Sequence, residues 1–299
     1  MDQLHLMTVF VAVAELRGFA PASRQLHMSP PAVTRAVAAL EKKVGVKLLA
    51  RTTRFVKTTE AGQRYLADAK RILHEVERAN EAVMGVHLEP KGLLRVTAPV
   101  LFGQKNVLPV VVQYLNDYPQ TKVDCVFVDR VVNLLEEGFD VGVRIGHLAD
   151  STMNARLVGQ VSLQLVASPE YIAVNGLPNS PQDLSNHTLI ASSFGDMSYD
   201  WHFHLNKQPS SIRIAPTLIV NTNQAAINAA KQNLGISRVL SYQVGEELKQ
   251  GKLKTILTQF QLPTLPVHIV HREGPNASNK IRAFIDLLAK QLLSDSILN

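Results

Sequence analysis

Apolar residues recur every three or four positions through the first 40 residues, which is the spacing of amphipathic helices. The pattern predicts a first helix that ends near residues 17–18. Its apolar positions are Leu6, Val9, Phe10, Val13 and Ala14. A short helix over 21–26, a turn at 27–28 and a helix over 30–40 are expected to follow and to enclose one small core. The last helix contributes Val33, Val37 and Leu40.

The opposite face of the 30–40 helix is typical of a surface that reads DNA. It offers one cation, one hydroxyl and small apolar groups, with no carboxylate, from Pro31, Thr34, Arg35 and Ala38. Such a face can enter the major groove, where arginine reads guanine and threonine offers a hydroxyl and a methyl. On this stretch alone, a solvated helix of an ordinary small bundle explains the pattern equally well.

Ser29 is the expected N-cap of this helix, because serine is favoured at that position and proline suits the first helical position. Pro30 and Pro31 have no N–H. If the serine side chain makes a cap bond, the predicted donor is therefore the amide of Ala32.

The formal charge is concentrated at the N-terminal end. Residues 1–58 hold nine Lys and Arg residues against three acids, so they carry the whole net charge of +6. The other 22 basic and 22 acidic residues cancel. A basic segment joined to a neutral body is typical of a module that binds a polyanion and is attached to a second function.

Two short strands, over 46–49 and 55–57, are predicted to form a hairpin with a basic turn at 50–54. Its polar residues, Arg51, Thr52 and Arg54, can contact backbone phosphate or reach a minor groove. The alternative is a hairpin that only seals the edge of the core. The sign of the charge favours the contact.

A long helix is predicted from about residue 60 to residue 87, with Thr59 as its cap. Its apolar positions repeat at alternating intervals of four and three. They are Tyr65, Ala69, Ile72, Val76, Ala79 and Val83. This heptad row predicts a seam for another helix, and the small N-terminal core cannot bury all of it. Packing on the chain's own C-terminal body is the alternative.

Residues 89–92 (Glu-Pro-Lys-Gly) break the helix and mark a boundary. Beyond them strands alternate with helices, which predicts an α/β body with a mostly parallel sheet. The expected strands cover 93–98, 122–128, 140–145, 163–167, 189–192, 212–215, 218–221, 235–239, 253–257 and 266–271. The expected helices cover 106–118, 131–136, 223–232 and 279–293.

The sequence lacks the residue patterns that are typical of several other kinds of site or segment. The single cysteine, Cys125, excludes an internal disulfide and fits a reducing cytosol; a small core residue is favoured over a redox switch there. No secretory signal and no apolar run of about 20 residues is visible. His202 and His204 are too few for a zinc site, and Trp201 is interpreted as a packing residue. No catalytic constellation, no metal site and no cofactor is predicted.

The order and spacing of the N-terminal motifs resemble the winged helix–turn–helix of LysR-type transcriptional regulators. The motifs that carry the resemblance are Phe10-Val11-Ala12-Val13, Gly18-Phe19, Leu26, Ser29-Pro30, Ala32-Val33-Thr34-Arg35, Leu40-Glu41, Gly45-Val46, Leu48-Leu49, Arg51-Thr52-Thr53-Arg54 and Thr59-Glu60-Ala61-Gly62. Pro21 and Ser23 depart from the family pattern, without putting the fold in doubt. The resemblance implies that Phe19 to Ala38 bind DNA, with Ser29, Pro30, Pro31, Thr34 and Arg35 at the contact. It implies further contacts from the wing.

More weakly, the body resembles the effector domain of the same family, which looks like a type 2 periplasmic solute-binding protein. The carrying motifs include Gly92-Leu93-Leu94-Arg95-Val96, Tyr118-Pro119, Asp140 to Gly146, Gly235-Ile236 and Gly251-Lys252-Leu253. The implied layout is a DNA-binding domain over 1–59, a dimerisation helix over 60–90 and an effector domain over 91–299. The effector domain would divide into subdomain I, about 91–162 and 266–299, and subdomain II, about 163–265.

The effector site is expected where two strands run out into helix N-termini, at 98–103 and 220–224. Such termini can hold an anion, and ligands of open α/β sheets lie beyond the carboxyl ends of strands. The resemblance implies that the two segments face each other across a cleft. The candidate residues are Pro99, Val100, Leu101, Phe102, Val128, Arg144, Ser192, Asn221 and Thr222. Leu101 and Phe102 would form an apolar wall. Arg144 could supply a counter-charge, although a structural pair with Asp140 is equally compatible.

We therefore expect a cytoplasmic, non-enzymatic regulator that binds double-stranded DNA and a small organic acid with an apolar part. The resemblance implies a dimer or a homotetramer, and RNA polymerase is a further candidate partner. A DNA-binding or architectural protein whose body serves only oligomerisation is the alternative. An enzyme fused to a DNA-binding head is a third reading, which the absence of a catalytic pattern disfavours.

Overall fold

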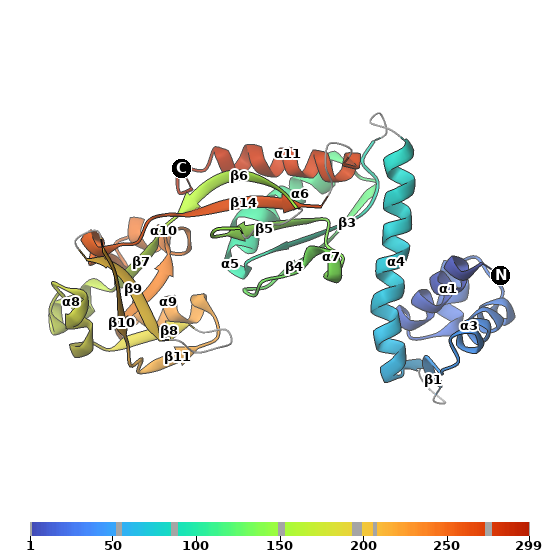
Figure 1. Cartoon of the computed structure of the whole chain (residues 1–299), viewed down its shortest axis with the longest axis horizontal. Coiled ribbons are helices and arrows are strands. Elements are labelled where there is room, and N and C mark those ends of the chain that lie inside the picture. The colour runs from blue at the N-terminus through green and yellow to red at the C-terminus, as the bar shows by residue number, and fades with distance from the viewer. Residues whose placement is uncertain are drawn as a thin grey trace. The chain divides into compact units, whose positions relative to one another are not determined.

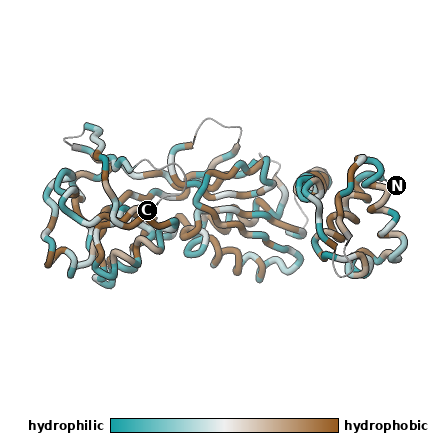
Figure 2. Tube along the Cα trace, turned by 90° about the horizontal axis from the view of Figure 1, so that it is seen from below, coloured by the Kyte–Doolittle hydropathy of each residue, from teal (hydrophilic) through white to brown (hydrophobic). Residues whose placement is uncertain are grey.

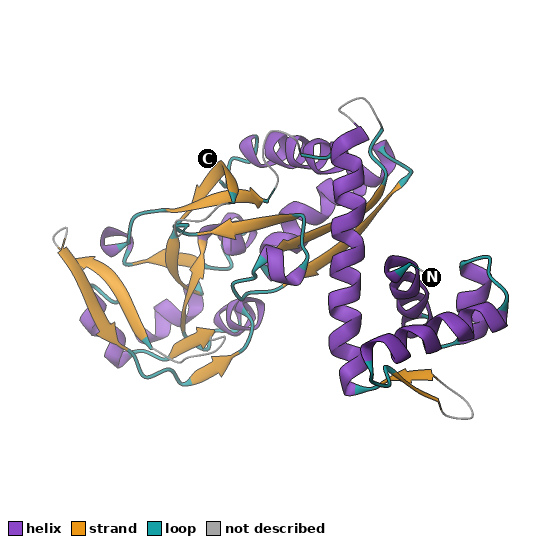
Figure 3. Cartoon of the chain, turned by 45° about the vertical axis from the view of Figure 1, so that its right-hand side comes forward, coloured by secondary structure: helices purple, strands orange, loops and turns teal. Residues whose placement is uncertain are grey.

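The computed structural model describes residues 2–51, 56–84, 89–148, 153–192, 199–205, 208–272 and 277–298. The chain forms two units, Met1–Val86 and His87–Asn299. The first is mostly helical, and the second alternates helices with strands (Figure 3). In each unit the apolar segments gather in the interior (Figure 2).

Three helices build the core of the N-terminal unit, as the apolar spacing predicts. They are α1 (Gln3–Glu15), α2 (Phe19–Gln25) and α3 (Pro30–Val44) (Figure 1). Val33, Val37 and Leu40 are at most 1% exposed, and they pack with Phe10 and Val13. The wing is an antiparallel pair of β1 (Leu49–Arg51) and β2 (Val56–Thr58). The first strand thus begins three residues later than predicted.

The start of α3 differs from the prediction in one bond. The Ser29 side chain makes no cap hydrogen bond. Instead, the amides of Ala32 and Val33 both donate to the Ser29 carbonyl, at 2.9 and 3.1 Å. Because both prolines lack an N–H, these are the first two donors of the helix, and the backbone carbonyl accepts both.

The Glu41 side chain connects α3 to the start of the wing. The residue is 8% exposed, and its carboxylate accepts from the amides of Leu48 and Leu49 at 3.0 and 3.1 Å. Lys47 donates to its second oxygen at 2.7 Å. A side chain of α3 therefore binds the amides that lead into the wing. Burial raises the pKa of Glu41, but the Lys47 ammonium and the two amides lower it more, so it lies below its ordinary value of 4.5.

The long helix α4 (Glu60–Met84) packs its first turns on this core. Thr59 caps it as predicted, because its hydroxyl accepts from the Gly62 amide at 2.9 Å. Gly62 lies so close to the wing that a Cβ there would be 1.9 Å from the Leu48 carbonyl oxygen. The Tyr65 ring lies 5.6 Å from that of Phe10, measured between centroids. The first part of the apolar row of α4 is therefore packed against the core of the same chain's N-terminal unit, and the described residues farther along the row are not.

The second unit contains two five-stranded sheets. The first has the order β4-β3-β5-β14-β6. Its strands are β3 (Gly92–Ala98), β4 (Thr121–Phe127), β5 (Val141–Ile145), β6 (Asn154–Val161) and β14 (Leu265–His271). One face is covered by α6 (Leu108–Asp117) and α11 (Asn279–Leu293), and the other by α7 (Leu134–Glu137) (Figure 1). The helical run into α6 begins with α5 (Val100–Phe102) and a π-helical turn, η1 (Gly103–Val107).

The second sheet has the order β11-β8-β12-β7-β13. Its strands are β7 (Leu163–Ala167), β8 (Leu189–Ser192), β11 (Leu218–Val220), β12 (Ile236–Leu240) and β13 (Lys254–Ile256). Helices α9 (Asn223–Lys231) and α10 (Ser241–Lys249) cover one face. The other face packs against α8 (Pro169–Asn175) and a hairpin of β9 (Asp200–Leu205) and β10 (Gln208–Arg213). Two 3-10 turns, η2 (Pro181–Asn186) and η3 (Thr258–Phe260), complete the unit.

The sheets are mixed rather than mostly parallel. β3, β4 and β5 run parallel, as do β8, β11 and β12, but β14 and β7 are antiparallel to all their partners. The chain enters each of these strands from the other sheet. β7 follows β6 after the single residue Ser162, and β14 follows β13 after residues 257–264. Parallel neighbours, in contrast, need a longer crossover connection, usually a helix. The sequence pattern also missed β6, β9, α8 and α10, and its strand over 212–215 covers only the last two residues of β10.

The Glu41 carboxylate yields a test of the N-terminal fold. Glu41→Ala leaves two buried amides without an acceptor, and we expect it to lower the opening free energy of α1–α3 by about 2–4 kcal/mol, since each orphaned donor costs about 1–3 kcal/mol. Glu41→Gln keeps an oxygen for both amides and loses only the pair with the exposed Lys47, so we expect a loss below about 1 kcal/mol. Native-state hydrogen exchange on the full chain measures both.

The same carboxylate predicts a pH dependence. A depressed pKa in the folded state stabilises that state above the unfolded value and loses this contribution as the pH falls through the folded value. The stability advantage of the wild type over Glu41→Gln is therefore complete above pH 4.5 and vanishes below it. An advantage that grows as the solution is acidified contradicts this assignment.

Candidate nucleic-acid interface and effector cavity

The outer face of α3 lies as the sequence predicts. Pro31, Arg35 and Ala38 are exposed, and Thr34 is half-buried. Arg35 makes no hydrogen bond or ion pair with another described residue. The one acid of α3, Glu41, is turned toward the wing. The exposed face of α3 is therefore free of carboxylate and carries an unpaired guanidinium, which suits a major groove.

The structure describes only some of the remaining residues that were predicted to contact DNA. Ser29 and Pro30, at the start of α3, are exposed. Arg51 ends β1. Thr52 and Arg54 lie outside the described residues. Their contacts stay predictions.

A cavity of about 550 Å³ lies between the two sheets of the second unit. Its lining comes from the carboxyl ends of β3 and β5 on one side and of β8 and β12 on the other. Open α/β sheets bind ligands at these ends, and the volume suits a small molecule. The cavity is therefore the candidate effector site.

Four of the nine residues expected at this site line the cavity: Pro99, Val128, Arg144 and Ser192. The other five, Val100, Leu101, Phe102, Asn221 and Thr222, do not. Leu101 and Phe102 are turned into the core, where the Phe102 ring packs edge-on against Tyr242 at 5.1 Å between centroids. They do not form the apolar wall that the sequence suggested.

The two helix N-termini expected to hold an anion are occupied by the chain's own groups. The first amide of α5, that of Val100, donates to Asp129 at 2.9 Å. The Thr222 hydroxyl accepts from the amide of Ala225 at 3.2 Å and so caps α9. Asn223 lines the cavity and accepts a hydrogen bond from the Ser192 hydroxyl.

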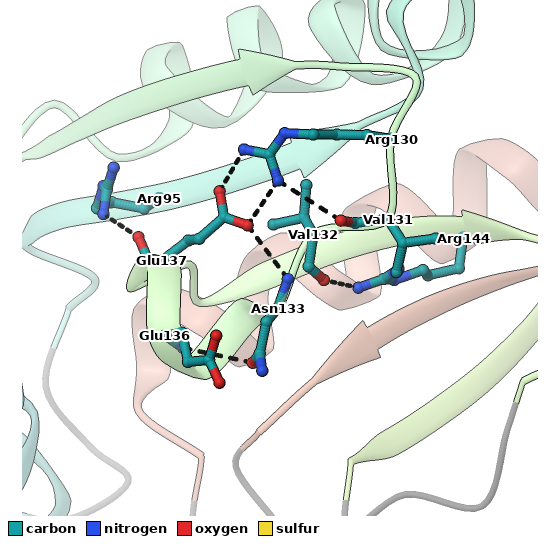
Figure 4. A network of polar contacts seen from close by, with 8 residues as sticks. All are labelled: Arg95, Arg130, Val131, Val132, Asn133, Glu136, Glu137 and Arg144. Carbon is teal, nitrogen blue, oxygen red and sulfur yellow. Dashed lines mark hydrogen bonds and ion pairs between the residues drawn. The ribbon is translucent and has the colours of Figure 1, made fainter. Parts of the chain in front are cut away.

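Two of the three arginines that line the cavity are engaged within its wall (Figure 4). Arg130 forms a bidentate ion pair with Glu137, at 2.7 and 2.6 Å, which lowers the pKa of that carboxyl below its ordinary range. Arg144 donates to the Val132 carbonyl and makes no ion pair with Asp140, which instead accepts from the Arg95 amide. Burial lowers the pKa of Arg144, and the nearby Glu137 opposes that effect. These contacts fasten the segment 128–133 to α7 and β5.

The third arginine, Arg238 on β12, was not among the residues that the sequence analysis expected at this site. Its guanidinium lies over the ring of Trp201, 5.1 Å from the centroid. It makes no hydrogen bond or ion pair with another described residue, and burial alone lowers its pKa to about 10. Trp201 is 4% exposed, so it packs as predicted and also supports this cation. The available signal was a single charge inside the apolar strand 236–240.

The described part of the chain was also searched for a metal site, a reactive cysteine and a membrane-spanning helix. No three His, Cys, Asp or Glu side chains there are placed to hold a metal ion. Cys125 is half-buried in β4, and burial raises the pKa of its thiol to about 11, with a further contribution from Asp124. A membrane-spanning helix was sought among the described residues, and none qualifies in length and apolarity.

Two family matches cover most of the chain. Residues 4–63 match the bacterial regulatory helix-turn-helix proteins of the lysR family, and residues 87–293 match the LysR substrate binding domain. The regulator CrgA of Neisseria meningitidis serogroup C is 31% identical over 287 residues, or 96% of each chain. The transcriptional activator AaeR of Escherichia coli K12 is 30% identical over 291 residues, which span 96% of this chain and 93% of AaeR.

The fold agrees with these matches. The solved structure of CrgA from Neisseria meningitidis superposes with a TM-score of 0.62 at 29% identity, and the match covers 98% of this chain and 99% of that one. It is described as a LysR-type transcriptional regulator. Helix-turn-helix, substrate-binding unit and full-length relatives thus agree, and the chain belongs to the LysR family of bacterial transcriptional regulators.

Proposed function

We propose that this regulator binds promoter DNA through α3 and the wing, and that a small organic acid in the cavity of the second unit controls its output. One observation carries the proposal: a carboxylate-free helix face with an unpaired Arg35 belongs to the same chain as a cavity of about 550 Å³ at converging strand ends. The first suits a polyanion and the second a small molecule.

We propose the domain limits 1–59, 60–90 and 91–299, with residues 91–162 and 266–299 as one subdomain and 163–265 as the other. The membership of the two sheets supports the last division. We place the protein in the cytoplasm, where its DNA lies, and RNA polymerase is a candidate partner there. No part of the proposal requires catalysis.

We also propose that α4 pairs two chains, and that the second units join dimers into a tetramer. Tyr65 and Leu66 pack against the core of the N-terminal unit, and Ala69 is fully buried. Ile72 and Val76 continue the same row beyond the core cluster of the head, half-buried. A half-buried apolar row on an otherwise polar helix suits a second copy of the same helix.

The variant Arg35→Ala tests the proposal that α3 is the DNA-recognition helix. Loss of one base contact should reduce specific affinity by about 1–3 kcal/mol and relax sequence preference. The probe is a DNA fragment that the wild-type protein selects from a random pool, measured by fluorescence anisotropy at several salt concentrations. Arg156→Ala is the matched control, because this exposed arginine of β6 lies in the second unit, where it pairs with Asp286 of α11. Equal affinity of Arg35→Ala and wild type would show that another surface reads DNA.

Pairing through α4 is tested by the double variant Ile72→Asp, Val76→Asp. Two charges in an apolar seam cost several kcal/mol when they are buried without partners, so analytical ultracentrifugation should show loss of the dimer. Gln63→Asp with Ala67→Asp is the control, since both positions are exposed on the same helix. A wild-type protein that sediments as a monomer at micromolar concentration refutes the pairing.

Control by an effector is tested by footprinting the protein on DNA with and without small molecules, and we expect the footprint to change when the effector is present. A protein whose footprint responds to no metabolite would instead be the effector-independent DNA-binding protein whose body serves oligomerisation.

A further inference from the structure

Most charged groups around the cavity have a hydrogen-bond or ion-pair partner within the chain. Glu137 balances Arg130 in a bidentate pair. The carboxylate of Asp129 accepts from the first amide of a helix, where the helix dipole favours a negative charge. Arg144 is hydrogen-bonded to the Val132 carbonyl. Each of these groups has a structural partner.

Arg238 is the exception. Its guanidinium has five N–H donors, and none of them bonds to another described residue. It is half-buried in the cavity wall. Charged groups taken out of water are normally paired, because an unpaired one loses hydration without compensation. A ligand anion in the cavity would supply the missing partner.

The contact with Trp201 prepares this cation for one kind of partner. The guanidinium carbon lies over the Trp201 ring, 5.1 Å from its centroid, and a cation–π contact uses none of the N–H donors in a hydrogen bond. A carboxylate can accept two parallel hydrogen bonds from a guanidinium. The contact also restricts the side chain before a ligand arrives, which reduces the entropy lost on binding.

The charges at the cavity favour a ligand with one negative group. Three arginines and Asp129 line the cavity, and Glu137, which is not part of the lining, pairs with Arg130. One positive charge remains, so one carboxylate neutralises it and a second would be in excess. The remaining wall contains a group of apolar side chains, Val128, Val143, Ile190, Val239 and Leu265, beside the polar side chains of Thr97, Ser192, Asn223 and Gln243.

We infer that Arg238, which lies over the Trp201 ring, binds the carboxylate of the effector, and that the effector is a monocarboxylic acid with an apolar body. This inference rests on the proposed function and assigns anion recognition to β12 rather than to Arg144 or the two helix N-termini. Because Arg238 belongs to the second sheet while Pro99, Val128 and Arg144 lie at the ends of the first, such a ligand contacts both sheets.

The experiment uses the full-length protein and matched pairs of probes. Hexanoate and phenylacetate are compared with their neutral amides, hexanamide and phenylacetamide, and with the diacid adipate. Thermal shift screens them, and isothermal titration calorimetry gives the affinities. We expect the monoacids to bind wild type at least about tenfold tighter than the amides, as charged hydrogen bonds contribute about 1.5–3 kcal/mol. Adipate should bind more weakly than hexanoate.

Three variants separate Arg238 from the general charge of the cavity. Arg238→Met should remove the preference for acids over amides. Arg238→Lys keeps the charge but loses the two-pronged geometry, and it should weaken monoacid binding by about tenfold. Arg130→Lys makes the same exchange at an arginine already paired with Glu137, and it should change monoacid affinity by less than about threefold. Melting temperatures without ligand establish that each variant folds.

The outcomes distinguish this inference from the proposed function. Amides that bind as well as acids, or an Arg238→Met variant that still prefers acids, overturn the role of Arg238 and leave the cavity as the effector site. If no probe binds but the footprint responds to another metabolite, the ligand class is overturned and the regulator stands. If no molecule alters the footprint, the effector part of the proposed function fails and this inference fails with it.

Discussion

The arrangement of the second unit depends on how the chain crosses between its two sheets. The first crossing, from β6 to β7, takes the single residue Ser162. Its amide donates to the Ser241 hydroxyl at 3.2 Å, and its carbonyl accepts from the Ser241 amide at 2.8 Å. The crossing is thereby fixed to the junction of β12 and α10, next to Arg238. This pair of bonds therefore helps to place Arg238 relative to the first sheet, together with the apolar cluster that both sheets share.

The same crossings explain where sequence reasoning succeeded and failed. Helical periodicity predicted α3 and α11, because packing of one face dictates their sequence. β8 is instead a short continuous apolar run, since both of its faces are buried. β6 carries Asn154 and Arg156 with little alternation, since most of its first half is exposed. α10 contains Gly245, a poor helix former; the space beside it is taken by Ile297 near the C-terminus. The antiparallel direction of β7 and β14 is a tertiary property that a local pattern does not contain.

The site was predicted in outline and not in detail for a related reason. A strand that runs into a helix can be recognised from sequence, and this located the strand ends that line the cavity. The rotation of the helix about its axis decides which side chains reach the cavity, and that follows from packing. Phe102 packs against Tyr242, so the 100–102 segment turns its large apolar groups inward. Asp129, distant in sequence, then occupies the amide that a ligand was expected to use.

The charged groups Glu41, Asp129, Glu137 and Arg144 all have partners within the chain, and Arg238 is informative because it has no hydrogen-bond or ion-pair partner among the described residues. In the head, the buried Glu41 carboxylate is satisfied by two amides and a lysine. Around the cavity, Asp129, Glu137 and Arg144 have partners in the chain. A polar group with internal partners stabilises the fold and has little left to offer a ligand. A half-buried cation held on a tryptophan, open to a cavity and without a described partner, contributes little to the fold by itself. Its natural complement is an anion from outside the chain.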